Sequence, residues 1–160
     1  MGSVRRAILG AALFSLACCT KTRTGVPDAG AEPWTTLSLL AGGLGGPGSI
    51  DGHGLDARFQ SPRSLTRDGG NLYIADSDNC TVRKMELATG EVTTVAGTAR
   101  TCNTVDGFGT AAQLKYPEVI AADGAGNLYV AEQYQLRRIV IATGEVTRSV
   151  GVLGDIGRMA

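Results

Sequence analysis

The sequence predicts an all-β fold built from two copies of one repeat. The hexapeptide ATGEVT occurs at residues 88–93 and again at residues 142–147. Glycine is abundant, and only 5% of the residues are aromatic. Short runs of Val, Ile, Leu and Thr lie between turns rich in Gly, Asp and Asn, which is typical of strands joined by tight turns.

The surroundings of the hexapeptide repeat as well. NLYIAD at 71–76 matches NLYVAE at 127–132, and DGHG at 51–54 matches DGFG at 106–109. The spacing between the copies changes only in turns, as between DGGN and DGAGN. Insertions confined to turns, with the apolar pattern kept, indicate a structural repeat.

Each repeat is expected to contain four short strands. They are predicted at 64–67, 72–75, 81–87 and 92–96, and again at 119–122, 128–131, 135–141 and 146–150. Gly90 and Gly144, in the Thr-Gly-Glu turns, are expected to adopt positive φ. A four-stranded meander of roughly 40–50 residues is typical of a β-propeller blade.

The chain resembles the NHL-repeat family in ADGAGNLYVAE, TVRKMELATGEVTTVAG and LRRIVIATGEVT. The resemblance covers about residues 37–151, with blade one at about 37–97, blade two at about 98–151 and a tail at 152–160. It implies NHL-type propeller blades. Members of this family are binding platforms for proteins, RNA or glycans, and a minority are metal-holding enzymes, so the resemblance implies a fold rather than an activity.

Two blades form an incomplete ring, because propellers close with about four to eight. Residues 36–41 are interpreted as the outer strand of a preceding blade. Three explanations remain open: a homo-oligomeric ring, a companion propeller chain that completes the ring, and a truncated or split gene product. The sequence favours truncation, because the chain stops just after the second blade.

Residues 1–18 are predicted to form a signal peptide, with basic residues before an apolar stretch at 7–17 that is too short to span a bilayer. Leu16 precedes Cys19 by three positions, which resembles a bacterial lipobox and makes Cys19 the expected lipidated residue. Cys18 is the alternative, and a plain secretory signal is the other reading. Residues 19–36 are expected to be a flexible tether. The protein is thus predicted to be exported and anchored to the lipid bilayer, at the outer membrane or periplasmic face of a bacterial envelope.

Cys80 and Cys102 are predicted to form a disulfide. Cys80 lies between the second and third strands of its repeat, and Cys102 lies in the loop after the fourth, and these two connections emerge at the same end of a blade. An exported protein meets an oxidising compartment, and the bond would contribute roughly 3 kcal/mol. Two free thiols are the alternative. A metal site is less favoured, because no His or third Cys accompanies the pair.

A candidate ligand face carries Asp51, His53, Asp106 and Phe108, at corresponding positions of the loops 43–61 and 98–116. His53 is the only histidine of the chain, and Phe108 takes its place in the second repeat, which favours packing or solvation over catalysis. The two aspartates lack the further ligands of a calcium loop and are expected to be Asx-turn residues.

Basic residues recur at matching strand positions, as Arg83-Lys84 and Arg137-Arg138. Adjacent strand residues point to opposite faces, so one of each pair can reach a neighbouring strand. We expect structural ion pairs with Asp76 and Glu132. A basic stripe for an anionic ligand is the alternative.

The function that this pattern favours is a noncatalytic binding or scaffold module without a cofactor, whose ligand is a protein or a glycan. Nucleic acid is not an expected partner, because 15 basic residues are balanced by 15 acidic ones. One alternative is a truncated remnant, or part of a larger propeller, with no independent activity. The other is a propeller enzyme that needs residues from other chains, since clustered metal ligands are lacking.

Overall fold

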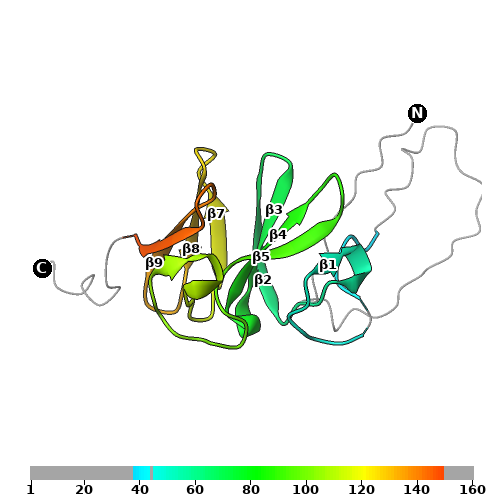
Figure 1. Ribbon diagram of the computed structural model, residues 1–160, viewed down its shortest axis with the longest axis horizontal. Helices are drawn as coiled ribbons and strands as arrows, with labels where there is room; N and C mark the ends of the chain where they lie inside the picture. Colours follow the sequence, from blue (N-terminus) through cyan, green and yellow to red (C-terminus); the bar gives the residue numbers. More distant parts are fainter. Residues whose placement is uncertain (1–37, 44, 150–160) are drawn as a thin grey trace, which may run out of the picture.

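Two antiparallel sheets of five strands lie side by side in the computed structural model, which describes residues 38–43 and 45–149 (Figure 1). The predicted all-β fold and its division into two repeats are confirmed. The predictions for the signal peptide, Cys18, Cys19, the tether and the tail fall outside the described residues. Among the residues that are described, no helix is long and apolar enough to cross a membrane.

The first sheet, blade one, has the strand order β1-β5-β4-β3-β2. Its strands are β1 (Gly52–His53), β2 (Pro62–Asp68), β3 (Asn71–Asp76), β4 (Thr81–Glu86) and β5 (Glu91–Ala96). The second sheet, blade two, repeats this order as β6-β10-β9-β8-β7. Its strands are β6 (Gly107–Phe108), β7 (Val119–Ala122), β8 (Asn127–Ala131), β9 (Leu136–Val140) and β10 (Glu145–Arg148).

The four strands predicted for each repeat are present within one or two residues of their expected bounds, but the four-stranded count is wrong. A fifth strand of two residues pairs with the last strand of each repeat. Gly52 of β1 stands opposite Val92, and Gly107 of β6 stands opposite Val146. The Asp-Gly-x-Gly segments were expected to be loops, because two residues that include a glycine carry no alternating pattern. Short 3-10 turns follow them, at η2 (Gly54–Asp56) and η4 (Gly109–Ala111).

Residues 38–41 are not in a strand, contrary to the outer strand expected at 36–41. The segment nevertheless packs on blade one, where Ala41 is buried beside Phe59. The Gly42 N–H donates to Gly54 O at 3.1 Å, just as the Gly97 N–H after β5 donates to Gly109 O at 3.2 Å. The segment therefore occupies, on blade one, the place that the end of β5 occupies on blade two.

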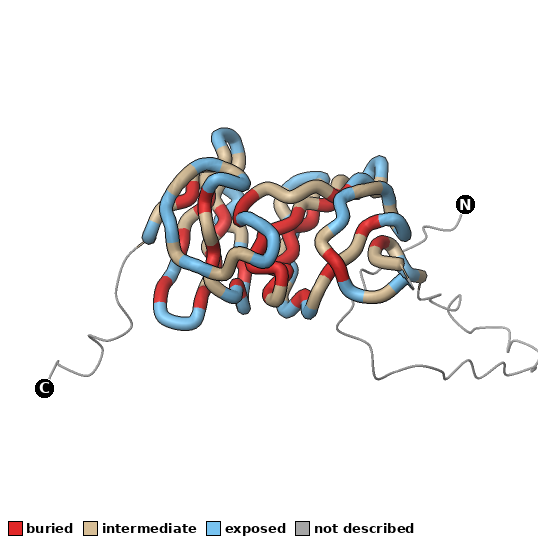
Figure 2. Tube along the Cα trace, turned by 60° about the horizontal axis from the view of Figure 1, so that its bottom comes forward, coloured by how far each residue is buried: buried red, intermediate tan, exposed pale blue. Residues whose placement is uncertain are grey.

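The main core lies between the two sheets, where the buried segments gather in Figure 2. Alternation along β3 explains this, because Leu72 and Ile74 face one side of blade one while Tyr73 and Ala75 face blade two. The blade-two side of the same core is formed by Ala112, Leu114, Ile120, Leu128, Val130, Ile139 and Val146. The two blades thus share one apolar core.

Hydroxyl groups join the innermost strands of the two blades. Ser64 Oγ of β2 accepts a hydrogen bond from the Ile120 N–H of β7 at 3.2 Å, and Thr66 Oγ1 accepts one from the Ala122 N–H at 3.2 Å. β7 is an edge strand of its own sheet. These side chains therefore satisfy backbone donors that have no partner strand beside them.

Two hairpin turns behave as predicted. Gly90 and Gly144 have φ of 80° and 71°. Their carbonyl oxygens also accept hydrogen bonds from the N–H groups of Gly54 and Gly109, at 2.9 and 2.8 Å. The turn between the last two strands of each repeat is thereby tied to the short strand at the start of that repeat.

Candidate functional site

Arg83 of β4 is fully buried and holds three segments of blade one together. Its Nη1 donates to Asp76 Oδ2 at 3.2 Å and to the Arg58 carbonyl at 2.9 Å. Its Nη2 donates to Asp51 Oδ1 and to the Ile50 carbonyl at 2.9 Å. A buried guanidinium requires both counter-charges and acceptors for its fork of N–H donors. This one obtains them from strand β3 and from the loop around β1.

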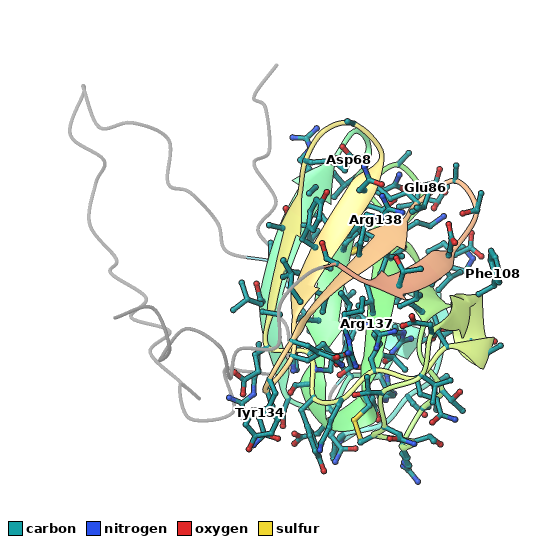
Figure 3. The ribbon with its side chains drawn as sticks, turned by 90° about the vertical axis from the view of Figure 1, so that its left-hand side faces the viewer. Asp68, Glu86, Phe108, Tyr134, Arg137 and Arg138 are labelled. Atoms are coloured by element: carbon teal, nitrogen blue, oxygen red, sulfur yellow. A yellow bond between two sulfur atoms is a disulfide. The ribbon has the colours of Figure 1, made fainter. Side chains whose placement is uncertain are left out.

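Arg137 of β9 has the equivalent role in blade two, and Figure 3 shows it inside the blade. Its Nη2 donates to Asp106 Oδ1 at 2.6 Å and to the Val105 carbonyl at 3.2 Å. Its Nη1 donates to the Gln113 carbonyl at 3.3 Å and lies 3.6 Å from Glu132 Oε1. The same network has been kept in both repeats.

These contacts match the predicted ion pairs of Arg83 with Asp76 and of Arg137 with Glu132. The Asx-turn role expected for Asp51 and Asp106 is wrong. Their carboxylates accept hydrogen bonds from the arginines of distant strands, and Asp51 Oδ2 also accepts one from the Thr94 N–H at 3.0 Å. A buried arginine attracts the carboxylate more strongly than a local backbone donor does.

Burial raises the pKa of Asp76 above its ordinary value, and its hydrogen-bond donors oppose that rise. The Gln60 N–H donates to Oδ1 at 2.7 Å, and Asn79 Nδ2 donates to Oδ2 at 2.7 Å, beside Arg83. The carboxyl group is completely shielded from solvent. Its surroundings suit an internal counter-charge rather than an acid that meets a ligand.

Glu132 repeats this arrangement with a longer pair of side chains. Burial raises its pKa, and donors again oppose the rise. Gln135 Nε2 donates to Oε2 at 2.6 Å, and the Lys115 N–H donates to Oε1 at 3.1 Å. Glu132 and Gln135 therefore stand where Asp76 and Asn79 stand in blade one, each one methylene longer.

The predicted disulfide between Cys80 and Cys102 is present. Cys80 is fully buried in the β3–β4 connection, and Cys102 lies in the loop between β5 and β6. The Arg100 N–H donates to the Asn79 carbonyl at 2.9 Å, so a hydrogen bond reinforces the link. We call this end of the blades the loop end. The sulfur bond is visible there in Figure 3, opposite the end at which Asp68 and Glu86 close strands β2 and β4.

The structure separates the members of the predicted ligand face. Asp51 and Asp106 are engaged with the buried arginines. His53 and Phe108 end the short strands β1 and β6 at the outer edge of each sheet, and both are exposed, Phe108 by 62%. Ligand contact at these four residues stays a prediction.

A second group of side chains, which the sequence pattern did not single out, lies at the loop end and consists of two exposed tyrosines and a half-buried lysine. Lys115 Nζ stands 5.9 Å from the centre of the Tyr134 ring. Tyr134 is 62% exposed, and Tyr116 is 44% exposed with a φ of 48°. An available signal was that Tyr116 replaces Ser61 of the first repeat before a proline. We call Lys115, Tyr116 and Tyr134 the tyrosine cluster.

Glu118, two residues after Tyr116, forms an exposed ion pair with Arg63 of blade one. Arg63 Nη1 lies 4.0 Å from Glu118 Oε1. In the described part of the chain, no three His, Cys, Asp or Glu side chains are grouped so that they could hold a metal ion. The loop end thus offers aromatic rings and single charges as its contacts.

The fold defines blades of a β-propeller, and comparison with known proteins shows which proteins the chain resembles. The chain is 32% identical over 105 residues to protein SUPPRESSOR OF QUENCHING 1, chloroplastic, of Arabidopsis thaliana, covering 65% of the chain and 9% of that protein. It is 31% identical over 105 residues to NHL repeat-containing protein 2 of Bos taurus, covering 62% and 14%. No family model matches the chain.

Solved structures give a consistent result. A protein of unknown function from Bacteroides thetaiotaomicron aligns with a TM-score of 0.57 and 28% identity, over 69% of this chain and 26% of that one. An auxiliary nutrient binding protein from Bacteroides ovatus aligns with a TM-score of 0.54 and 22% identity, over 72% and 29%. The predicted resemblance to NHL-repeat propellers is confirmed. The chain spans less than a third of the length of each of these relatives.

Proposed function

We propose that the chain is a noncatalytic binding module whose ligand, a protein or a glycan, contacts the loop end of the blades. The observation that carries the proposal is the tyrosine cluster, whose two tyrosines are exposed on connections that the buried Arg137 network holds in place. Tyr and Arg are enriched among the residues that anchor binding interfaces. A rigid scaffold that presents such side chains loses little entropy when it binds.

The ionisable groups support a binding role over a catalytic one. Asp76 and Glu132, whose pKa values burial raises, face Arg83 and Arg137 inside the blades. They serve as counter-charges that fix the loops. A propeller enzyme assembled with residues from other chains is the alternative, and it would need its acid and base elsewhere.

The setting that we propose for this module follows the sequence. Residues 1–18 are a signal peptide, Cys19 (or Cys18) carries the lipid, and 19–36 are a tether that holds the blades away from a bacterial envelope membrane. The auxiliary nutrient binding protein from Bacteroides ovatus is similar in fold. Nutrient capture at the cell envelope is a role that this setting would suit. The remaining blades of a ring would come from further copies or from a companion chain.

The test uses two aromatic residues of equal exposure. Tyr134 at the loop end and Phe108 at the outer edge are both 62% exposed and point in different directions (Figure 3). Maltoheptaose, xylohexaose and N-acetylchitohexaose serve as glycan probes, with binding measured by calorimetry. For a probe that binds, we expect Tyr134→Ala to weaken binding about tenfold, roughly 1.4 kcal/mol, and Phe108→Ala to leave it unchanged.

The opposite pattern would move the ligand to the outer edge, where the structure places Phe108 and His53 of the predicted ligand face. If none of the three sugars binds, the glycan form of the proposal is wrong. The alternative of a propeller part without independent activity would then be favoured over a glycan receptor.

A further inference from the structure

The two repeats are folded alike, so the covered face of one blade shows what the matching face of the other can bind. Tyr73 and Val82 of blade one are 2% and 0% exposed, because blade two covers them. Their counterparts in blade two are Tyr129, which is only half-buried, and Leu136, which is 37% exposed. Figure 3 looks onto this side of blade two, with Arg138 on it. We call it the trailing face of blade two.

On the other side of blade one only the edge strand is open, because Ala41, Ala57 and Phe59 already pack on the strands behind it. Ile120 of β7 is 4% exposed because it packs against blade one, whereas its counterpart Leu65 of β2 is 46% exposed. We call the side of blade one that carries Leu65 the leading face. The described structure thus leaves Tyr129 and Leu136 partly open on the trailing face and Leu65 open on the leading face.

One pair of charges is placed to be complementary across the two open faces. Within the chain, Arg63 of blade one pairs with Glu118 of blade two, and both side chains are more than half exposed. These two residues occupy corresponding positions in the repeats. If blade one of a second copy followed blade two, its Arg63 would therefore lie beside Glu118 of the first copy. The two side chains would again carry opposite charges. Like charges at this position would have opposed such a contact.

We propose that the trailing face of blade two binds the leading face of blade one in a second copy of this chain, head to tail. The contact would repeat the geometry of the junction between the two blades within one chain. Because it joins two different surfaces, it would give rings if the rotation closes and open chains of molecules if it does not. It concerns the faces of the blades and does not depend on any ligand at the loop end.

The new junction is expected to be weaker than the internal one. Ser64 and Thr66, which accept hydrogen bonds from β7, correspond to Val119 and Ala121 in blade two, and these side chains have no hydroxyl group. Val119 is 55% exposed and would instead add apolar contact. Residues 40–42 already occupy, on blade one, the position that the end of β5 occupies on blade two. The second copy therefore does not have to supply a strand end at that position. We therefore expect association that depends on protein concentration.

Two engineered cysteines test the contact. Ser64 points toward blade two, so the next residue, Leu65, points away from blade two. Ile120 points toward blade one, so the preceding residue, Val119, points away from blade one. The two side chains therefore cannot meet within one molecule. The full chain is used in detergent, and every sample carries Cys18→Ser and Cys19→Ser. One protein also carries Leu65→Cys and the other Val119→Cys. The two proteins are mixed and oxidised with copper phenanthroline.

We expect a cross-linked dimer in the mixture at a yield at least tenfold above that of either protein alone. Leu55→Cys mixed with Val119→Cys is the matched control, because Leu55 is 55% exposed but lies in the turn η2. Equal cross-linking with the control, or none in the test mixture, would overturn the proposal. A further Leu136→Glu change in the Val119→Cys protein should reduce the yield several-fold while circular dichroism stays unchanged, and an unaffected yield would also contradict it.

Discussion

Single residues with matching roles in the two repeats explain how the loops are held. Arg83 and Arg137 each reach from an interior strand to the aspartate that precedes the short first strand of the blade. Nearby backbone carbonyls accept further hydrogen bonds from their Nη1 and Nη2 atoms. A guanidinium suits this place better than an ammonium would, because its planar fork donates in several directions at once.

Replacing Arg83 by methionine should be costly because it leaves Asp76 buried without its counter-charge. Removing one partner of a buried ion pair costs about 3–5 kcal/mol. The neighbouring Lys84 is half-buried on the other face of the same strand, and Lys84→Met should cost less than about 1 kcal/mol. Urea unfolding of both variants measures the difference. Equal losses would contradict the role assigned to Arg83.

The carboxylate of Asp123 is expected to make stability depend on pH. It accepts hydrogen bonds from the Ala125 N–H at 2.8 Å, the Asn127 N–H at 3.0 Å and Asn127 Nδ2 at 2.7 Å, and these bonds lower its pKa. A group with a lowered pKa contributes stability that is present above its unfolded pKa and is lost as pH falls through the folded one.

Asp123→Asn should therefore reduce the free energy of unfolding near neutral pH and have a smaller effect in acid. Asp68→Asn, at the matching turn of blade one, is the control for the general effect of removing a charge there. The two variants are compared by urea unfolding between about pH 7 and about pH 2.5. An Asp123→Asn effect that stays constant over this range would show that the carboxylate charge is not the cause.

At the residue scale, the sequence predicted the contacts that adjacent strands bring together and missed those that need the path of a loop. Arg83 could be paired with Asp76 because consecutive strands of a meander lie side by side. Asp51 could not be assigned, because only the folded chain brings the loop before β1 back against β4 and β5. The exposure of Tyr134 likewise depends on how the β8–β9 connection turns.

At the scale of elements, the short strands β1 and β6 are the feature that sequence patterns did not reveal. Each has two residues, one of them glycine, so neither alternation nor propensity marks it as a strand. Their partners β5 and β10 belong to the four-strand pattern that was found. The boundaries of those longer strands could be predicted well, because Asp-Gly and Thr-Gly-Glu turns limit them.

Gly97, just after β5, should not tolerate a side chain. A Cβ there would lie 2.3 Å from the Cys80 carbonyl oxygen, and its φ is +90°. Gly69 also has a positive φ, of +54°, but no atom would lie within 4 Å of an added Cβ. We expect Gly97→Ala to lower the free energy of unfolding by about 3 kcal/mol and Gly69→Ala by about 1 kcal/mol. A smaller loss at Gly97 than at Gly69 would rule out the proposed clash.

Loss of the disulfide should loosen the loop between β5 and β6 more than the sheets. The double variant Cys80→Ala, Cys102→Ala is expected to lose roughly 3 kcal/mol of stability, mainly through the unfolded chain. Hydrogen exchange of the Arg100 N–H, which bonds Asn79, should become faster. Exchange of the Val92 N–H in β5 serves as the reference. Equal acceleration at both sites would contradict a local effect.

At the scale of the whole molecule, the shared core couples the two blades. Side chains of β3 and β4 pack into the same cluster as those of β7, β8 and β9. Blade one has a second cluster of its own on its other side, but the buried apolar side chains of blade two in the described structure all belong to the shared cluster. The described structure should therefore unfold as a single cooperative unit rather than one blade at a time.

Tyr73→Ala should test this coupling. Tyr73 lies in the shared core, and truncating a buried aromatic side chain costs about 3–5 kcal/mol. Tyr129 occupies the same position in blade two but is only half-buried, so Tyr129→Ala should cost less. In the Tyr73→Ala protein, amide exchange should accelerate in both sheets together. Acceleration in blade one alone would show that the blades unfold independently.

The overall architecture was predictable because repetition is visible without any knowledge of contacts. Two copies of one pattern indicate two equivalent sheets, and the apolar faces of such sheets must cover each other. The particular side chains that join the sheets were not predictable. Ser64 and Thr66 resemble any polar strand residues, until the folded chain places them beside the free N–H groups of β7.

The pairing of the first strand of each repeat with its last strand also has a genetic consequence. β1 with β5, and β6 with β10, make each repeat a sheet that is complete within one continuous stretch of codons. An in-frame duplication or deletion of such a stretch adds or removes a whole blade and leaves no strand without its neighbour in the sheet. Genes that encode blades of this kind can therefore change their number of repeats by unequal recombination while every sheet keeps its own strand pairing.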